Sequence, residues 1–205
     1  MLKNYNMERL LIVGCRRSGT TLLASLLGAH SQINMLNEAY GDEITRLIGK
    51  RYQAVKLGYP HISFTKKYSR LYRLLYHKLV LPRLRLRLLG WKIDMLIGSK
   101  YSIHDYEKMG AKIVIIHRNK KPNVDSMIRR SEISKKKAEK DWQEFNDKSF
   151  NIKGAWHISL SSLTEDTEQC LIYICKYLDI EFEKSMLLSS GMNNSYKNHT
   201  IEIKN

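Results

Sequence analysis

The feature that most constrains this chain is an apolar run that ends in a glycine-containing loop and is followed by a second apolar run. Residues 9–13 (RLLIV) stop at Gly14, and small and leucyl residues follow over 21–27. This order predicts a strand, a tight loop and a helix. Such a loop binds anions, because the first N–H groups of a helix lack intrahelical partners and the helix dipole favours negative charge there. The sequence therefore predicts a phosphate site near its N-terminus.

The loop has the glycine spacing of a Walker A loop but lacks the lysine of that motif. Gly14 and Gly19 flank four residues, and Thr20 stands where lysine is expected. The nearest cations, Arg16 and Arg17, precede Gly19 instead. We therefore expect phosphate binding without the Mg²⁺-triphosphate chemistry of kinases and NTPases.

Further apolar runs predict three more strands, at residues 53–57, 112–116 and 155–160. The run at 112–116 (KIVII) is unbroken and rich in β-branched residues, which suits a strand buried on both faces of a parallel sheet. Helical periodicity predicts helices over 122–146 and 164–178. Strands that alternate with helices indicate an α/β fold in three layers, with a central parallel β-sheet flanked by helices.

Length and composition predict one soluble domain over residues 1–205. The chain is 43% hydrophobic and 27% charged, which is ordinary for a globular protein. No apolar run is long enough to cross a bilayer, and the N-terminus does not read as a secretory signal, so we expect a cytoplasmic protein. The three cysteines lack metal-ligand spacing, and no metal site is expected.

Positive charge is concentrated in one part of the chain. Lys plus Arg total 35 against 20 Asp plus Glu, and nine of these cations lie between residues 66 and 92. We expect residues 58–95 to form a basic helical insertion that docks an acidic acceptor or an anionic membrane surface. The alternative is an amphipathic helix packed on the core with a solvated charged face. No aromatic-bearing nucleic-acid module accompanies the segment, so no nucleic-acid partner is expected.

The loop sequence Arg17-Ser18-Gly19-Thr20-Thr21-Leu22 resembles the 5′-phosphosulfate-binding loop of sulfotransferases. In that family a basic residue precedes Ser-Gly-Thr-Thr, and the loop binds 3′-phosphoadenosine 5′-phosphosulfate (PAPS), the sulfuryl donor. The resemblance implies a P-loop NTPase-like sulfotransferase fold. It also implies that the donor is bound by Arg16, Arg17, Ser18, Gly19, Thr20, Thr21 and Leu22.

A second motif follows the strand predicted at 112–116. Arg118 comes directly after this strand, and Ser126 lies eight residues later. An arginine at the carboxyl end of a parallel strand lies on the ligand side of the sheet, and its planar guanidinium suits a phosphate. The same spacing resembles the 3′-phosphate site of sulfotransferases, and RNKKPNVDSMI is similar to a stretch of tyrosylprotein sulfotransferases. The resemblance implies that Arg118 and Ser126 bind the 3′-phosphate, with Tyr196 and Lys197 closing over the nucleotide.

Sulfuryl transfer needs a base for the acceptor proton. Resemblance to tyrosylprotein and carbohydrate sulfotransferases implies Glu38, in Asn-Glu-Ala-Tyr, as that base. Asp42 and Glu43 are rivals, and His61 and His104 rank below them because neither lies in a matching motif.

Cations must also face the charge that grows on the leaving phosphate. Arg17 is expected to do this at the 5′-phosphosulfate. Lys100, in Gly-Ser-Lys-Tyr, resembles a Gly-x-Lys-x-Pro element of bacterial members, and Lys56 is the alternative for the same role.

These features predict transfer of a sulfuryl group from PAPS to the hydroxyl of a carbohydrate acceptor, a glycan or glycolipid, without a metal. A P-loop nucleotide kinase is the alternative enzyme, and the missing lysine after Gly19 counts against it. A non-catalytic module that binds nucleotide or polyanion is the alternative outside enzymes.

Overall fold

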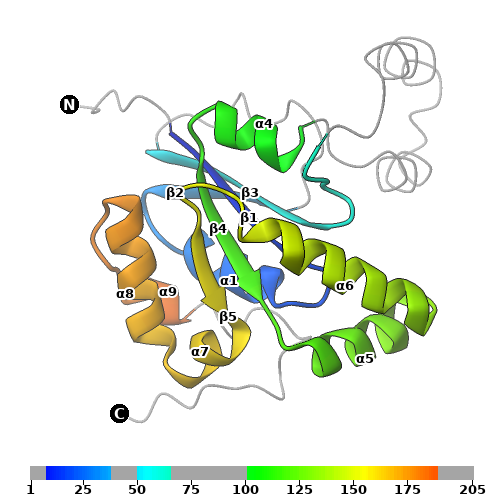
Figure 1. Cartoon of the computed structure of the whole chain (residues 1–205). Helices are drawn as coiled ribbons and strands as arrows, with labels where there is room; N and C mark the ends of the chain where they lie inside the picture. The colour runs from blue at the N-terminus through cyan, green and yellow to red at the C-terminus, as the bar shows by residue number, and fades with distance from the viewer. Residues whose placement is uncertain (1–7, 38–49, 66–100, 189–205) are drawn as a thin grey trace, which may run out of the picture.

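The computed structural model describes residues 8–37, 50–65 and 101–188, which form a sheet covered by helices on both faces (Figure 1). The sheet has five strands in the order β2-β3-β1-β4-β5, and every neighbouring pair is parallel. The predicted α/β architecture with a central parallel sheet is confirmed. Among helices of the described ranges, none is long and apolar enough to cross a bilayer.

The strands are β1 (Glu8–Cys15), β2 (Ile33–Asn37), β3 (Tyr52–Tyr59), β4 (Lys112–His117) and β5 (Trp156–Ser159). Four of them fall on the predicted runs. The edge strand β2 was not predicted, because its sequence INMLN mixes asparagine with apolar residues. It forms by pairing along β3, from Ile33 beside Tyr52 to Asn37 beside Lys56.

The helices are α1 (Thr20–Gly28), α4 (Ile103–Lys108), α5 (Lys120–Ser131), α6 (Lys135–Ser149), α7 (Leu160–Glu165), α8 (Thr167–Leu178) and α9 (Ser185–Leu188). Both long predicted helices are divided. The first breaks at Glu132, which adopts a left-handed φ of 51°, and Ser134 caps the helix that follows. The second breaks at Asp166, whose side chain accepts a hydrogen bond from the Gln169 N–H and starts α8.

The start of the predicted basic insertion is not helical. Residues 58–59 end β3 and residues 60–65 form turns and bends. The reason is that Gly58 and Tyr59 continue the parallel pairing of β3 with Gly14 and Cys15 of β1. The rest of the insertion, 66–95, lies outside the described residues.

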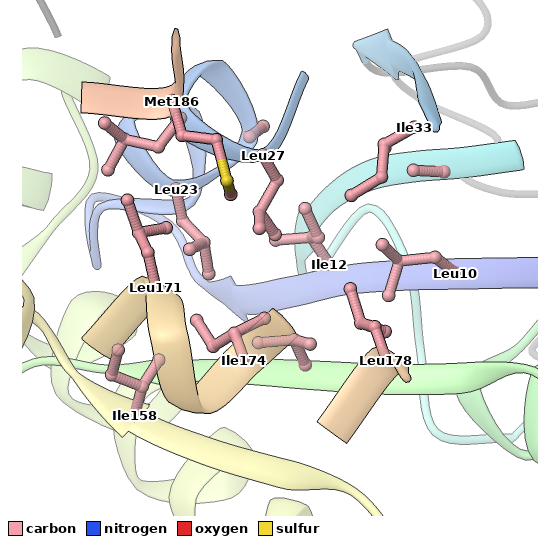
Figure 2. Close-up of a cluster of buried hydrophobic side chains, with 14 of the residues drawn as sticks. Leu10, Ile12, Leu23, Leu27, Ile33, Ile158, Leu171, Ile174, Leu178 and Met186 are labelled. Atoms are coloured by element: carbon pink, nitrogen blue, oxygen red, sulfur yellow. The ribbon is translucent and has the colours of Figure 1, made fainter. Parts of the chain in front are cut away.

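The core is built in two layers, one on each face of the sheet. Because side chains alternate along a strand, Leu10 and Ile12 of β1 face one layer while Leu11 and Val13 face the other. Figure 2 shows the first layer, where leucines of α1 and α8 meet the sheet. Each fully buried aliphatic side chain contributes roughly 1.5–3 kcal/mol, so this packing holds the carboxyl ends of the strands in place.

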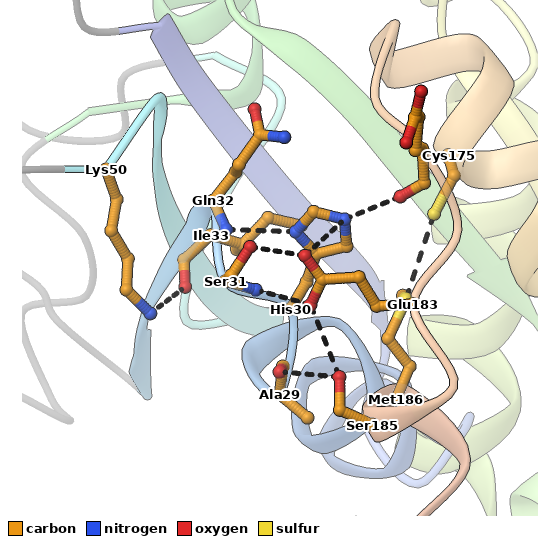
Figure 3. A network of polar contacts seen from close by, with 11 residues as sticks. Ala29, His30, Ser31, Gln32, Ile33, Lys50, Cys175, Glu183, Ser185 and Met186 are labelled. Carbon is orange, nitrogen blue, oxygen red and sulfur yellow. Dashed lines mark hydrogen bonds and ion pairs between the residues drawn. The ribbon is translucent and has the colours of Figure 1, made fainter. Parts of the chain in front are cut away.

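A polar network fixes the far end of α1 (Figure 3). His30 is fully buried, and its Nδ1 accepts a hydrogen bond from the Gln32 N–H (3.0 Å). Its Nε2 therefore carries the proton and donates to the Glu181 carbonyl oxygen (2.7 Å). Glu183 accepts from the Ser31 N–H and hydroxyl, which keeps the pKa of this carboxyl below its usual value although burial opposes the shift. The network ties the start of β2 to the segment before α9.

Candidate functional site: a nucleotide cavity

The loop between β1 and α1 has an unusual backbone. Arg17 has a φ of 66° and Gly19 a φ of 101°, both in the left-handed region, and the Ser18 N–H donates to the Cys15 carbonyl (3.0 Å). Helix α1 then begins at Thr20, and Gly19 offers no side chain to cap it. The first N–H groups of α1 are thus left for a ligand, as an anion site at a helix start requires.

Both loop glycines are required by their surroundings. A Cβ on Gly14 would lie 2.7 Å from the Ile116 carbonyl oxygen and would collide with Ser18 Oγ. A Cβ on Gly19 would lie 2.6 Å from Leu160 Cδ1, in addition to the cost of its positive φ. The chain can pass this closely to β4 and α7 because neither position has a side chain.

Several polar atoms around this loop are buried without a hydrogen-bond partner among the described residues. They are Arg16 Nε, Arg17 Nε and Ser18 Oγ. Buried donors of this kind are costly unless a ligand or water satisfies them. Of these residues Arg17 lines the cavity described below, and its orphaned donor fits a site that is completed by an anion.

The second motif lies beside the loop. Arg118 follows the last residue of β4, and its Nη1 donates to the carbonyl oxygen of Arg17 (3.0 Å). The Arg118 carbonyl in turn accepts from Trp142 Nε1 (2.9 Å). Ser126 lies on α5 and is 5% exposed. The fold therefore brings together two motifs that are about a hundred residues apart in the chain.

One cavity of about 560 Å³ connects the two motifs. Among the described residues it is lined by Arg17, 19–22, 117–120, Pro122, Ser126, Arg129, Arg130, Trp142, Asn146, Phe150, 159–161 and Thr164. Five of these are Arg or Lys and none is Asp or Glu, so the described wall attracts anions.

Lys56 reaches the loop from β3. Its side chain is 5% exposed, and Nζ donates to Thr21 Oγ1 (3.3 Å), next to the start of α1. The parallel register places Lys56 beside Ile12 on one side and Asn37 on the other. A buried ammonium group therefore stands behind the phosphate loop.

A chain of hydrogen bonds that runs through α6 ends at the main-chain carbonyl of Arg118. The His117 Nδ1 bonds to Asn146 Oδ1 (3.0 Å), so His117 Nε2 accepts from His157 Nδ1 (2.9 Å) in the neutral tautomers. Asn146 donates to the Trp142 carbonyl (2.8 Å), and Trp142 donates to Arg118. Phe150 stacks over both imidazoles, at 4.8 and 5.0 Å.

Burial lowers the pKa of both imidazoles, and the charge of His117 contributes further to the lowering at His157. The neutral forms that this hydrogen-bond chain needs are therefore the ones favoured at neutral pH.

Cys15 is the loop residue with a chemically reactive group, and its thiol is protonated. Burial, reinforced by Asp141, raises its pKa to about 12. A thiol with this pKa is not a nucleophile at neutral pH. Among the described residues, no group of three or more His, Cys, Asp or Glu is placed to hold a metal ion.

The predicted nucleotide-binding residues are only partly on the cavity wall. Arg17, Gly19, Thr20, Thr21, Leu22, Arg118 and Ser126 line it. Arg16 does not, since its side chain lies beside Gly58 on β3. Ser18 does not, because it is fully buried with its hydroxyl beside Gly14.

The predicted bases are not on the described wall either. His61 follows β3, and His104 lies on α4, where it bonds to Glu107 (2.9 Å). Glu38, Asp42, Glu43, Lys100, Tyr196 and Lys197 lie outside the described residues.

Several residues of the cavity wall were not among the predicted site residues. Arg129 and Arg130 follow Ser126 at helical spacing, a signal that was available once Ser126 was chosen. Trp142, Asn146 and Phe150 come from α6 and the residue after it, and no local pattern ties them to Arg118.

Comparison with known proteins gives one sequence match and several structural ones. Residues 9–80 match the family model described as the sulfotransferase family. No curated protein matches the chain by sequence.

Three solved structures share the fold, each with a TM-score of 0.51. The sulfotransferase domain from the curacin biosynthetic pathway is 16% identical, over 90% of this chain and 78% of that one. The sulfotransferase domain of the Synechococcus PCC 7002 olefin synthase is also 16% identical, over 91% and 78%. Mouse sulfotransferase SULT7A1 complexed with PAP is 14% identical, over 93% and 66%. The family model that matches residues 9–80 and the solved structures that share the fold are all described as sulfotransferases.

Proposed function

We propose that this protein transfers a sulfuryl group from PAPS to an acceptor hydroxyl. The observation that supports this most strongly is the single cavity that joins the phosphate loop to Arg118 and Ser126, with Arg118 bonded to the loop itself. Two anion sites in one cavity suit a nucleotide with phosphate groups at both its 5′ and 3′ positions. A structural neighbour that is complexed with PAP supports the same nucleotide.

In this proposal the loop holds the 5′-phosphosulfate. The free N–H groups at the start of α1, the Thr20 and Thr21 hydroxyls and Arg17 surround it. Arg118 and Ser126 hold the 3′-phosphate by charge-assisted hydrogen bonds. Arg16 and Ser18 support the loop rather than the ligand, since neither lines the cavity.

The reaction moves one sulfuryl group in line. The acceptor oxygen forms a bond to sulfur, the bond from sulfur to the bridging phosphate oxygen breaks, and 3′-phosphoadenosine 5′-phosphate (PAP) leaves. Arg17 and the α1 N–H groups stabilise the charge that grows on the bridging oxygen. We favour Lys56 over Lys100 as the second cation, because Lys56, although it lies outside the cavity wall, donates to the hydroxyl of Thr21, which is on that wall.

The acceptor proton goes to Glu38. This residue directly follows Asn37, the last residue of β2, which pairs with Lys56. Its place in the sequence therefore puts it next to the strand end that adjoins the proposed second cation. Asp42 and Glu43 are the alternatives for this role.

The proposed acceptor is a carbohydrate hydroxyl, and the proposed compartment is the cytoplasm. The acceptor rests on the resemblance to tyrosylprotein and carbohydrate sulfotransferases and on the net charge of +15. The suggested docking of a glycolipid or an anionic membrane through 66–92 stays a prediction, as that segment lies outside the described residues.

Calorimetry with PAP and with ATP–Mg²⁺ tests the donor. We expect PAP to bind at about micromolar Kd without metal, and ATP–Mg²⁺ to bind much more weakly. Tighter binding of ATP–Mg²⁺ would support a nucleotide kinase instead and overturn the proposal.

Turnover with ³⁵S-labelled PAPS tests catalysis. Glu38→Gln is expected to keep PAP affinity and lose turnover, whereas retained turnover would remove Glu38 as the base. PAP binding without any hydrolysis or transfer of the label by the wild-type protein would support a non-catalytic nucleotide-binding module.

A further inference from the structure

One face of α6 contacts the end of β4 at successive residues. Trp142, Asn146 and Phe150 are spaced four residues apart, so they lie on the same face of the helix, and all three line the cavity. Phe150 stacks on the ring of His117 at 4.8 Å, and Asn146 Oδ1 accepts from His117 Nδ1 (3.0 Å). Trp142 Nε1 donates to the next residue, at the carbonyl oxygen of Arg118 (2.9 Å). This face of α6 therefore fixes the chain where β4 ends.

Trp142 is the member of this face that holds Arg118. Its indole N–H can only donate, and it is used on the main chain of Arg118. The other end of Arg118 is held as well, because its Nη1 donates to the Arg17 carbonyl oxygen (3.0 Å). A hydrogen bond to the main chain fixes the point from which a side chain starts. The direction of the Arg118 guanidinium group therefore depends on Trp142.

The ring of Trp142 also holds a second cation. Lys120 is the first residue of α5, and its Nζ lies 5.8 Å from the centroid of the Trp142 ring. This distance is within the range of a cation–π interaction. Lys120 is exposed and lines the cavity, and no described residue of the cavity wall is acidic. Two cations of the wall thus meet at one tryptophan.

We propose that Trp142 is a positioning residue that holds Arg118, through its N–H, and Lys120, through its ring face, at the 3′-phosphate of the nucleotide. Lys120 is then a further ligand of this phosphate, beside Arg118 and Ser126. A phosphate monoester carries between one and two negative charges at neutral pH, which two cations balance better than one. This inference rests on the proposed function, in which Arg118 binds the 3′-phosphate.

Calorimetry with PAP and AMP on tryptophan variants tests the positioning role. AMP lacks the 3′-phosphate, so the ratio of the two dissociation constants reports on that group alone. Trp142→Phe removes the N–H and keeps an aromatic face, whereas Trp142→Leu removes both. Trp156→Phe is the matched control, because Trp156 is also half-buried but packs against Tyr177 on β5, outside the cavity wall. Partial unfolding would lower the number of binding sites in each titration and leave the ratio unchanged.

We expect Trp142→Phe to weaken PAP about threefold to tenfold and to leave AMP nearly unaffected, as the loss of one neutral hydrogen bond predicts. Trp142→Leu should weaken PAP further, because the ring face for Lys120 is also lost. Trp156→Phe should match the wild type with both nucleotides.

Lys120→Ala tests the second cation. It should weaken PAP about threefold to tenfold and leave AMP nearly unaffected. Lys121→Ala is the control, since Lys121 is the next residue, is equally exposed and lies outside the cavity wall. It removes the same charge and should leave the affinity for both nucleotides unchanged.

The double variant Arg118→Ala/Trp142→Phe separates positioning from direct contact with the ligand. If the indole N–H acts only through Arg118, the second substitution adds nothing once the Arg118 side chain is gone. The PAP dissociation constant of the double variant should then lie within about twofold of that of Arg118→Ala.

Four results would overturn the proposal: PAP affinity unchanged in Trp142→Phe, equal losses for PAP and AMP in that variant, fully additive losses in the double variant, or equal PAP affinity in Lys120→Ala and Lys121→Ala. A wild-type protein that does not bind PAP would instead refute the proposed function itself, so the two failures are distinguishable.

Discussion

The two ends of the cavity are built from different parts of the chain. The loop end, Arg17 and residues 19–22 with Lys56 behind them, offers main-chain N–H groups at the start of α1 and a buried ammonium group. The Arg118 end, Arg118 with Ser126, offers side chains that lie at the end of β4 and on α5. Binding by main-chain N–H groups is lost when the backbone conformation changes, whereas binding by side chains is lost when one side chain is removed. We infer that the loop end serves the reaction and the Arg118 end selects the nucleotide.

Lys56→Met should have the largest effect, and on turnover rather than binding. Lys56 donates to Thr21 at the start of α1, where charge grows in the proposed transition state. Removal of one such preorganised donor typically costs about 10²–10³ in kcat. Steady-state kinetics and PAP calorimetry on the same variant would measure this. A loss of PAP affinity as large as the loss of kcat would show that Lys56 holds the nucleotide and does not act on the transition state.

Gly19→Ala should disrupt phosphate binding at the loop end, because it changes the backbone conformation there. The position has a φ of 101°, and a Cβ would meet Leu160 Cδ1 at 2.6 Å. We expect PAP affinity to fall about a hundredfold, with a loss of stability of about 1–3 kcal/mol. Gly154→Ala is the matched control, because Gly154 has a φ of 69° with nothing within 4 Å of the new Cβ. Equal PAP binding in the two variants would contradict the account.

Arg118→Ala should weaken PAP about tenfold to a hundredfold and leave AMP, which lacks the 3′-phosphate, nearly unaffected. Arg118→Lys should keep little of the wild-type PAP affinity, since lysine cannot reproduce the planar, bidentate guanidinium of arginine. Calorimetry with PAP and AMP distinguishes direct binding of the 3′-phosphate by Arg118 from support of the loop by Arg118. Arg118 also bonds to the Arg17 carbonyl, so equal losses for PAP and AMP would show that it acts through the loop and not on the 3′-phosphate.

Ser126→Ala should have a smaller effect of the same kind. A neutral hydroxyl contributes about 0.5–1.5 kcal/mol to a hydrogen bond, so a loss of PAP affinity of a few-fold is expected. Ser131→Ala, at the end of the same helix and outside the cavity wall, is the control. A change in AMP affinity as large as that in PAP affinity would count against assigning Ser126 to the 3′-phosphate.

The smallest expected effect concerns the histidine pair that supports the Arg118 end. The pKa of His117 and His157 is lowered by burial, so the unfolded chain binds more protons than the folded one below about pH 6.5. The free energy of unfolding should therefore fall as the pH falls below that value. Protonation of His117 would also remove the acceptor for His157.

Urea unfolding at pH 7.5 and 5.5 measures this dependence. His117→Gln/His157→Asn should show a smaller difference between the two pH values than the wild type. The control, His104→Gln, replaces a histidine on α4 that bonds only to Glu107 among the side chains described. A pH dependence that is unchanged in the double variant would refute the role of this pair.

The loop and Arg118 could be predicted because their signals are local. The run ending at Gly14 and the run ending before Arg118 are each complete within a few residues, and parallel strands place their ends at one edge. Helix α4 was not predicted, although Ser102 and Asp105 form a capping box, which is a local sequence signal for the start of a helix.

Other features depend on pairing across the fold. Lys56 was only an alternative to Lys100, because its contact with Thr21 exists only once β3 lies beside β1. The pair of His117 and His157 likewise forms because β4 and β5 are neighbours, and neither residue carries a local signal for it. Arg16 was expected to bind the ligand, but the turn of the loop directs it toward β3.

The most direct test of the central claim is a crystal structure of the protein with PAP. We predict the 5′-phosphate within about 2.7–3.2 Å of the first N–H groups of α1, and the 3′-phosphate at the same distance from the Arg118 guanidinium and the Ser126 hydroxyl. A bisphosphate bound in the opposite direction, or bound without contact to Arg118, would contradict it.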